Sequence, residues 1–107
     1  MKIELFTELS YENETPPETF EIEINGELSI GELLSEIHKL KNIPQYRELK
    51  WDDNIQKISC RYHYKSGVEP DDYEMILNLE EKINTFPKFG TEGELSIFID
   101  GSSRMAN

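Results

Sequence analysis

The sequence has little cysteine, no long hydrophobic run and half as many basic as acidic residues. Its single cysteine, Cys60, excludes an internal disulfide, a zinc site of several thiolates and a cysteine-ligated iron–sulfur cluster. No apolar run approaches the roughly 18 residues of a membrane span. The opening residues, MKIELF, lack the hydrophobic region of a signal peptide. We therefore expect a cytoplasmic protein without a cofactor.

The 107 residues carry 22 acidic and 11 basic side chains, a formal net charge of -11. Nucleic-acid phosphates and anionic membranes repel such a chain, so we expect neither as a direct partner. The charge is uneven, because residues 37–66 hold seven bases and three acids between two strongly acidic segments. Two interpretations stay open: the bases pair with acidic neighbours inside the fold, or the acidic surface steers toward a basic partner protein.

A chain of this length predicts one domain over residues 1–107, with a mobile tail at 101–107. Alternating apolar residues predict two strands, at 2–9 and 20–24, which pair as a hairpin around a long acidic loop at 11–18.

Further alternation predicts strands at 47–51, 57–65 and 95–99. The segment 72–83 is ambiguous: it fits a strand at 73–79 followed by a helical turn near 80–85, or a helix throughout. We favour the strand, whose apolar face consists of Tyr73, Met75, Leu77 and Leu79.

A helix is predicted at about 30–41. Ser29 and Glu32 have the spacing of a capping box, and apolar residues then recur at helical intervals. Asn42 suits the helix end, and Pro44 blocks continuation. The competing signal is Asn25-Gly26, which is typical of a tight hairpin turn, but the helix-start signature outweighs it.

Together these features resemble the ubiquitin-like β-grasp family. The resemblance rests on Ser29-Ile30, Leu33, Ile37 and Ile43-Pro44, on a following third strand Arg47–Trp51, and on the closing strand Glu94–Ile99. It covers residues 1–51 and the last strand. It implies an α+β fold: a β-grasp-like mixed, mostly antiparallel sheet of about five or six strands packed on one main helix. A long insertion at 52–92 is expected to add a hairpin or helix.

The departures from the family bear on function. The chain has a lone Gly101 where conjugated members end in two glycines, so attachment through that terminus is not expected. A charged residue, Lys50, stands near the position of an apolar residue in ubiquitin's binding strand, which puts the usual apolar patch in question. The resemblance implies a fold and a habit of binding proteins rather than an activity.

Cys60 and His63 suggest a thiolate–imidazole pair, but residues of odd separation on a strand face opposite sides. We expect Cys60 to be a buried core thiol, and His63 to be a surface residue or the cross-strand partner of a carboxylate. We expect His38 to be solvated on the helix flank. The bases Lys57, Arg61 and Lys65 face away from Tyr62 and Tyr64, whereas an RNA-binding sheet presents aromatics and bases together.

Paired carboxylates at Asp52-Asp53 and Asp71-Asp72 leave a third hypothesis open, an enzyme or divalent-metal site. Turn chemistry explains such pairs more simply. No glycine-rich phosphate loop, Gly-x-Ser-x-Gly elbow or His-Glu-x-x-His helix is present in the sequence. We therefore expect neither a catalytic nor a metal site.

The leading functional hypothesis is a non-catalytic, acidic protein–protein interaction module, an adaptor or regulator whose partner has a basic surface. The alternative is an acidic inhibitor or nucleic-acid mimic that blocks the basic site of a nuclease or nucleic-acid-binding enzyme, as toxin-immunity and phage anti-defence proteins do. The oligomeric state stays open. The candidate partner-binding residues are Glu8, Glu12, Glu14, Glu18, Glu21, Glu23, Trp51 and Phe89.

Overall fold

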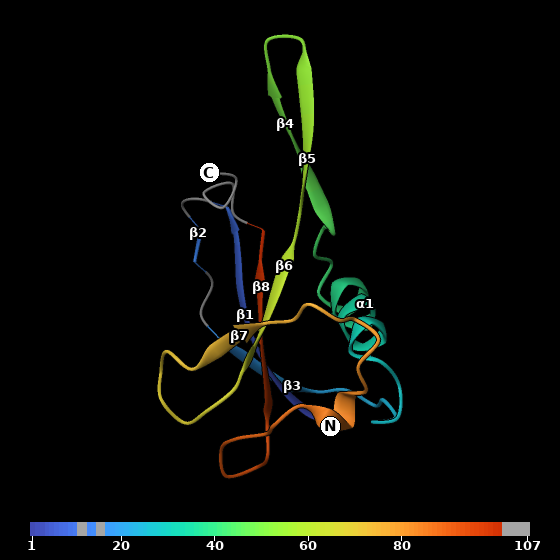
Figure 1. The fold of residues 1–107 in the computed structure, drawn as a ribbon, viewed down its shortest axis with the longest axis vertical. Helices are drawn as coiled ribbons and strands as arrows, with labels where there is room; N and C mark the ends of the chain where they lie inside the picture. The colour runs from blue at the N-terminus through green and yellow to red at the C-terminus, as the bar shows by residue number, and fades with distance from the viewer. Residues whose placement is uncertain (11–12, 15–16, 102–107) are drawn as a thin grey trace.

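The computed structural model describes residues 1–10, 13–14 and 17–101. Figure 1 shows a sheet with one helix beside it and a two-stranded hairpin projecting from one end. The elements, in chain order, are β1 (Lys2–Ser10), β2 (Asn13–Glu14), β3 (Glu18–Glu21), α1 (Ile30–Leu40), β4 (Tyr46–Trp51), β5 (Asn54–Ser59), β6 (Arg61–Lys65), β7 (Tyr73–Met75), the 3₁₀ turn η1 (Ile83–Thr85) and β8 (Leu95–Asp100).

The main sheet has the strand order β2-β1-β8-β6-β7, and β3 also pairs with β1. Strands β1 and β8 are parallel, and the other pairs of this sheet are antiparallel. A mixed, mostly antiparallel sheet packed on one helix confirms the predicted α+β class and is compatible with a β-grasp-like arrangement.

The core lies between α1 and one face of the sheet. Alternate residues of β1 and β8 point toward the helix, as the period of two requires. From the other side, α1 contributes side chains at helical spacing. The buried apolar residues are Ile3, Leu5, Ile30, Leu33, Leu34, Ile37, Ile43, Ile76, Ile83, Phe86, Leu95, Ile97 and Ile99.

The capping box at the start of α1 is confirmed. Ser29 Oγ accepts a hydrogen bond from the backbone N–H of Glu32 at 3.2 Å, and the Glu32 carboxylate accepts one from the N–H of Ser29 at 3.1 Å. After the helix, Asn42 takes a left-handed conformation with φ 55°, which ends the helix as expected. A turn forms at Asn25-Gly26, with the Leu28 N–H bonded to the Asn25 carbonyl at 3.0 Å, but it does not lead into a hairpin, because the carbonyls of Gly26 and Leu28 bond to residues 83–84.

The strand predicted at 47–51 forms, but it is not the third strand of the sheet. As β4 it pairs with β5 through the two-residue turn Asp52-Asp53, and this hairpin is a separate two-stranded sheet. The position beside β8 belongs to β6. The predicted strand 57–65 is split at Cys60, whose N–H donates to the Gln45 carbonyl at 3.2 Å and closes the base of the hairpin. The added hairpin therefore begins at Tyr46, ahead of the predicted insertion.

The segment 72–83 is not a helix. It contains the short strand β7 and an irregular stretch that leads to η1. The predicted apolar face was wrong: Ile76 is buried, whereas Met75, Leu77 and Leu79 are exposed. The reason is the register, because the N–H of Ile76 bonds to Tyr62 and places Ile76 on the helix side of the sheet.

The first hairpin is confirmed by the antiparallel pairing of β1 with β3, although β3 lies earlier than the predicted 20–24.

At the other end of the chain, the N–H of Gly101 donates to the Glu8 carbonyl at 2.8 Å. The rest of the predicted tail, 102–107, lies outside the described residues. In the part of the chain that the structure describes, no helix is long and apolar enough to span a membrane.

Candidate protein-interaction surface

The structure distributes the predicted carboxylates of the first hairpin over different environments. Glu18 forms an ion pair with Lys41, and Glu21 pairs with the N-terminal ammonium at 3.3 Å. Glu8 is half-buried on β1, whereas Glu23, just after β3, is exposed. Glu12 lies outside the described residues, and the side chain of Glu14 is not described. The described members of the set do not form one row of free carboxylates.

The two predicted aromatic anchors lie far apart in the topology. Trp51 ends β4 beside the turn of the projecting hairpin, and its side chain is not described. Phe89 is partly buried in the loop before β8, where its backbone exchanges hydrogen bonds of 2.9 and 2.7 Å with Glu94. The structure therefore does not bring Trp51 and Phe89 into one patch.

An open hollow of about 400 Å³ lies between α1 and the segment that follows β3. Of the predicted residues, only Glu23 lines it. The helix adds Glu32, Ser35 and Glu36, which share one flank because of their three- and four-residue spacing. The complete lining is Glu23, Ile24, Asn25, Leu28, Glu32, Ser35 and Glu36. From the sequence, Glu32 was predicted only as a helix cap, and Glu36 was not predicted as a site residue. The four-residue spacing between them indicates that they lie on the same side of the helix.

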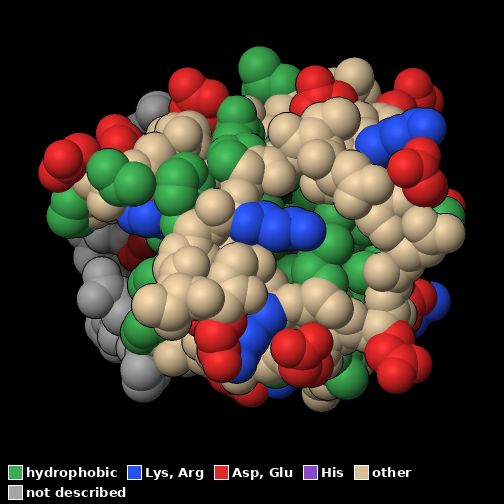
Figure 2. Space-filling model, turned by 90° about the horizontal axis from the view of Figure 1, so that it is seen from below, with side chains coloured by type: hydrophobic (Ala, Val, Ile, Leu, Met, Phe, Trp, Pro, Cys, Tyr) green, Lys and Arg blue, Asp and Glu red, His purple; other side chains and the backbone are tan. Residues whose placement is uncertain are grey.

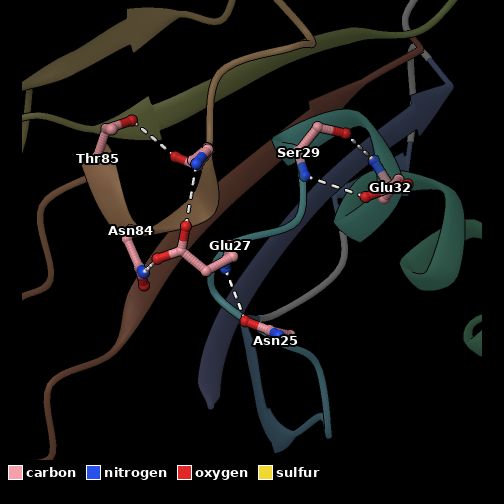
Figure 3. Close-up of polar contacts among 7 residues, drawn as sticks. Asn25, Glu27, Ser29, Glu32, Asn84 and Thr85 are labelled. Atoms are coloured by element: carbon pink, nitrogen blue, oxygen red, sulfur yellow. Dashed lines mark hydrogen bonds and ion pairs between the residues drawn. The ribbon is translucent and has the colours of Figure 1, made fainter.

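Polar contacts hold the segment 25–28, of which Asn25 and Leu28 line the hollow (Figure 3). Asn25 Oδ1 accepts a hydrogen bond from the Glu27 N–H at 2.9 Å. The Glu27 carboxylate accepts from Lys82 Nζ at 3.0 Å and from Asn84 Nδ2 at 3.1 Å. Hydrogen bonds to Lys82 and then to Asn84, together with the Lys82 charge, lower the pKa of Glu27. These hydrogen bonds hold residues 25–28 against the segment around η1.

Gly26 lies directly against the Asn84 side chain at this junction. A β-carbon at position 26 would lie 2.6 Å from Cγ of Asn84, and the Asn84 N–H bonds to the Gly26 carbonyl at 3.0 Å. A side chain at position 26 would therefore have to displace the Asn84 side chain.

The hollow joins negative charge to apolar surface. Glu36 pairs only loosely with Lys39, at 3.7 Å between exposed side chains, and such pairs contribute little. Among the described residues, Glu23 has no ion-pair partner. Ile24 and Leu28 provide apolar atoms between the carboxylates. This combination suits a Lys or Arg side chain, whose aliphatic stem packs on apolar atoms while its cationic head meets a carboxylate.

His38 is not solvated as predicted; it is 4% exposed. Its Nδ1 lies 2.9 Å from the Ile43 carbonyl, which can only accept, so Nδ1 carries the proton. Its Nε2 lies 2.7 Å from the Tyr62 hydroxyl, and in the tautomer with the proton on Nδ1 it accepts from that hydroxyl. The imidazole thus links the end of α1 to β6.

His63 is neither on the surface nor paired with a carboxylate as predicted. It is half-buried, it lies opposite Phe98 and Met75 in the sheet, and its ring is 5.6 Å from that of Phe98. Its Nδ1 is buried without a hydrogen-bond partner among the described residues. Cys60 is only partly buried, and its thiol donates to the Pro44 carbonyl at 3.4 Å.

The carboxylate pairs lie in turns. Asp52 has φ 51° in the turn of the β4–β5 hairpin, and Asp72 Oδ2 accepts from the Glu69 N–H at 3.1 Å in the loop before β7. Over the described ranges, no group of three or more His, Cys, Asp or Glu side chains could hold a metal ion.

The sheet face opposite α1 carries Arg61, His63 and Lys65, but aromatic residues of neighbouring strands share it. Phe6 and Phe98 lie in register with His63, and the Tyr73 ring meets that of Phe6 at 6.2 Å. Basic and aromatic side chains therefore lie on opposite faces within β6, but they share a face in the sheet as a whole. The prediction that the chain does not bind nucleic acid then depends on the net charge alone.

Figure 2 shows a face of the molecule with Asp and Glu side chains around much of its periphery.

Comparison of the chain with protein-family models, with curated proteins and with solved structures gives no match. No family is therefore assigned to it.

Proposed function

We propose that the chain is a non-catalytic protein-interaction module that binds a basic segment of a partner protein. The observation that carries the proposal is the open hollow, whose lining combines the carboxylates of Glu23, Glu32 and Glu36 with the apolar residues Ile24 and Leu28. The hollow receives a Lys or Arg side chain, and its fixed walls reduce the ordering cost of binding.

The net negative charge of the chain also supports a partner with a basic surface. A net charge of -11 accelerates encounter with a basic surface and repels phosphate-rich surfaces. The inhibitor hypothesis draws on free carboxylates of the first hairpin. Since Glu18 and Glu21 are already ion-paired within the chain, these two residues do not favour it over the interaction module.

The test compares two variants of equal charge. Glu23→Lys/Glu36→Lys reverses two carboxylates of the hollow, whereas Glu48→Lys/Asp53→Lys makes the same change in net charge on the projecting hairpin. Partners are captured from the native cell and identified by mass spectrometry, and their affinities are measured at low and high salt. We expect the hollow variant to lose at least about tenfold in affinity, and the control to keep most of it.

An equal loss in both variants would mean that only total charge matters and would contradict the proposal. A salt-insensitive partner that depends on Trp51 or Phe89 would also contradict it. Recovery of nucleases alone, with binding lost on charge reversal, would favour the inhibitor.

A further inference from the structure

Strand β7 is an edge strand, and the outward N–H and C=O of Met75 have no hydrogen-bond partner among the described residues. The outward N–H of Tyr73 bonds instead to the Asp71 carbonyl at 2.8 Å. Strand β7 ends the strand order of the main sheet and pairs only with β6 within the described chain. The N–H of Ser66 bonds to the Asp72 carbonyl at 2.7 Å, and the N–H of Ile76 bonds to the Tyr62 carbonyl at 2.8 Å. In an antiparallel ladder, bonded pairs alternate with non-bonded pairs. Met75, opposite His63, is thus a non-bonded residue that turns its N–H and C=O away from β6.

The same edge exposes large apolar side chains. Met75 is 42% exposed, and Leu77, two residues further along, is 85% exposed. Scattered apolar residues are normal on surfaces, but here they coincide with the unpaired backbone N–H and C=O of Met75. An extended backbone is the ligand that satisfies both features, because it bonds to the edge and alternates its side chains.

The acidic residues around β7 indicate which kind of strand can pair with its edge. An identical β7 edge from a second copy would bring like charges together. A strand with Lys or Arg at alternate positions instead meets opposite charge. The acidic residues in and around β7 are Glu69, Asp71, Asp72, Glu74, Glu80 and Glu81.

We propose that the β7 edge binds an extended strand of a partner protein, with alternating apolar and basic residues, as an additional strand of the main sheet. Its apolar side chains cover Met75 and Leu77, and its backbone bonds to Met75. This site is separate from the acidic hollow on α1 and goes beyond the function proposed for that hollow.

The test uses a synthetic eight-residue peptide of alternating valine and lysine, titrated into the whole labelled chain and followed by NMR. We expect shifts in β6 and β7, and slower hydrogen exchange of the Met75 amide by about tenfold or more at saturation. The control peptide has the same side chains with every backbone amide N-methylated. It keeps the charge but cannot donate to an edge, so we expect at least about tenfold weaker binding.

Two variants test the edge itself. Met75→Pro removes an N–H that does not bond to β6, so the chain is expected to stay folded and lose peptide binding. Met75→Lys keeps the backbone but replaces apolar surface with a cation, and it should also weaken binding. Glu23→Lys/Glu36→Lys should leave the β7 shifts in place, which separates this site from the hollow.

Shifts confined to residues 23–36, equal binding of the N-methylated peptide, or no binding would each overturn the proposal. A dimer of the chain alone in analytical ultracentrifugation that Met75→Pro dissociates would identify a second copy as the occupant, and would overturn it as well.

Discussion

At the scale of single residues, a buried imidazole and a partly buried hydroxyl satisfy each other where α1 meets β6. The Tyr62 hydroxyl donates to His38, and the two rings meet edge to face at 5.7 Å. Burial, and next the charge of Cys60, raise the pKa of Tyr62 to about 12. The hydroxyl therefore stays protonated at neutral pH.

This pKa predicts alkaline destabilisation. Below pH 10, Tyr62 is protonated in both the folded and the unfolded chain, so its contribution to stability is fully present. As pH rises from 10 toward 12, the unfolded chain loses the proton first, and stability falls. In a titration followed by tyrosinate absorbance, we expect a step near pH 12 that Tyr62→Phe lacks. A step that persists in the variant would assign it to another tyrosine.

A second residue-scale prediction concerns Gly26. Gly26→Ala forces Asn84 aside and breaks its bond to Glu27, so we expect a loss of about 1 kcal/mol in the free energy of unfolding. In an Asn84→Ala background the obstacle is absent, and the same substitution should cost clearly less. Both are measured by urea denaturation. Additive effects in the double-mutant cycle would contradict the proposed clash.

At the scale of elements, the projecting hairpin is structurally separate from the main sheet. Strands β4 and β5 pair with each other, while Gln45 and Cys60 are joined by a backbone hydrogen bond at the base. An isolated two-stranded hairpin is marginally stable in water, so it contributes little to the stability of the core.

Excision of residues 46–59 tests this separation. Joining Gln45 to Cys60 through an Asn-Gly turn should leave Tm within a few degrees of the parent, because none of the excised residues whose side chains the structure describes belongs to the buried core. NMR shifts of β1 and β8 should also be unchanged. Loss of cooperative unfolding would mean that the hairpin is part of the folding unit.

Local signals predicted the elements better than their pairing. The Ser29–Glu32 capping box and the alternation around Ile3 and Ile97 specified α1, β1 and β8 without any distant contact. The place of β4 could not be predicted in this way, because Arg47–Trp51 has the same pattern whether it joins the sheet or folds back on β5. The exposure of Met75 could not be predicted either, because it depends on a hydrogen bond between Ile76 and Tyr62. Of the hollow, the sequence indicated Glu23 but not its proximity to Glu36.

At the scale of the whole molecule, self-repulsion opposes folding. The screening length is about 30 Å at 0.01 M salt and about 10 Å at 0.1 M. The molecule measures 49 × 27 × 22 Å, so at low salt repulsion acts across its full width. The exposed ion pairs, such as Lys41 with Glu18, are each worth only about 0–1 kcal/mol.

We therefore expect stability to rise with salt. Sodium chloride added from 0.01 to about 0.2 M should raise Tm by several degrees in thermal unfolding followed by circular dichroism. The hollow variant Glu23→Lys/Glu36→Lys, which is less negative, should show a smaller increase. A Tm that falls with salt would show that the ion pairs outweigh the repulsion.

The parallel pairing of β1 with β8 also has a consequence for synthesis. Ile3 lies opposite Leu95, and Phe6 lies opposite Phe98. A ribosome must make nearly all of the described chain before the first strand acquires its central neighbour, and non-local pairing of this kind is slow. The nascent first hairpin therefore emerges with its apolar face uncovered, in the state that chaperones recognise.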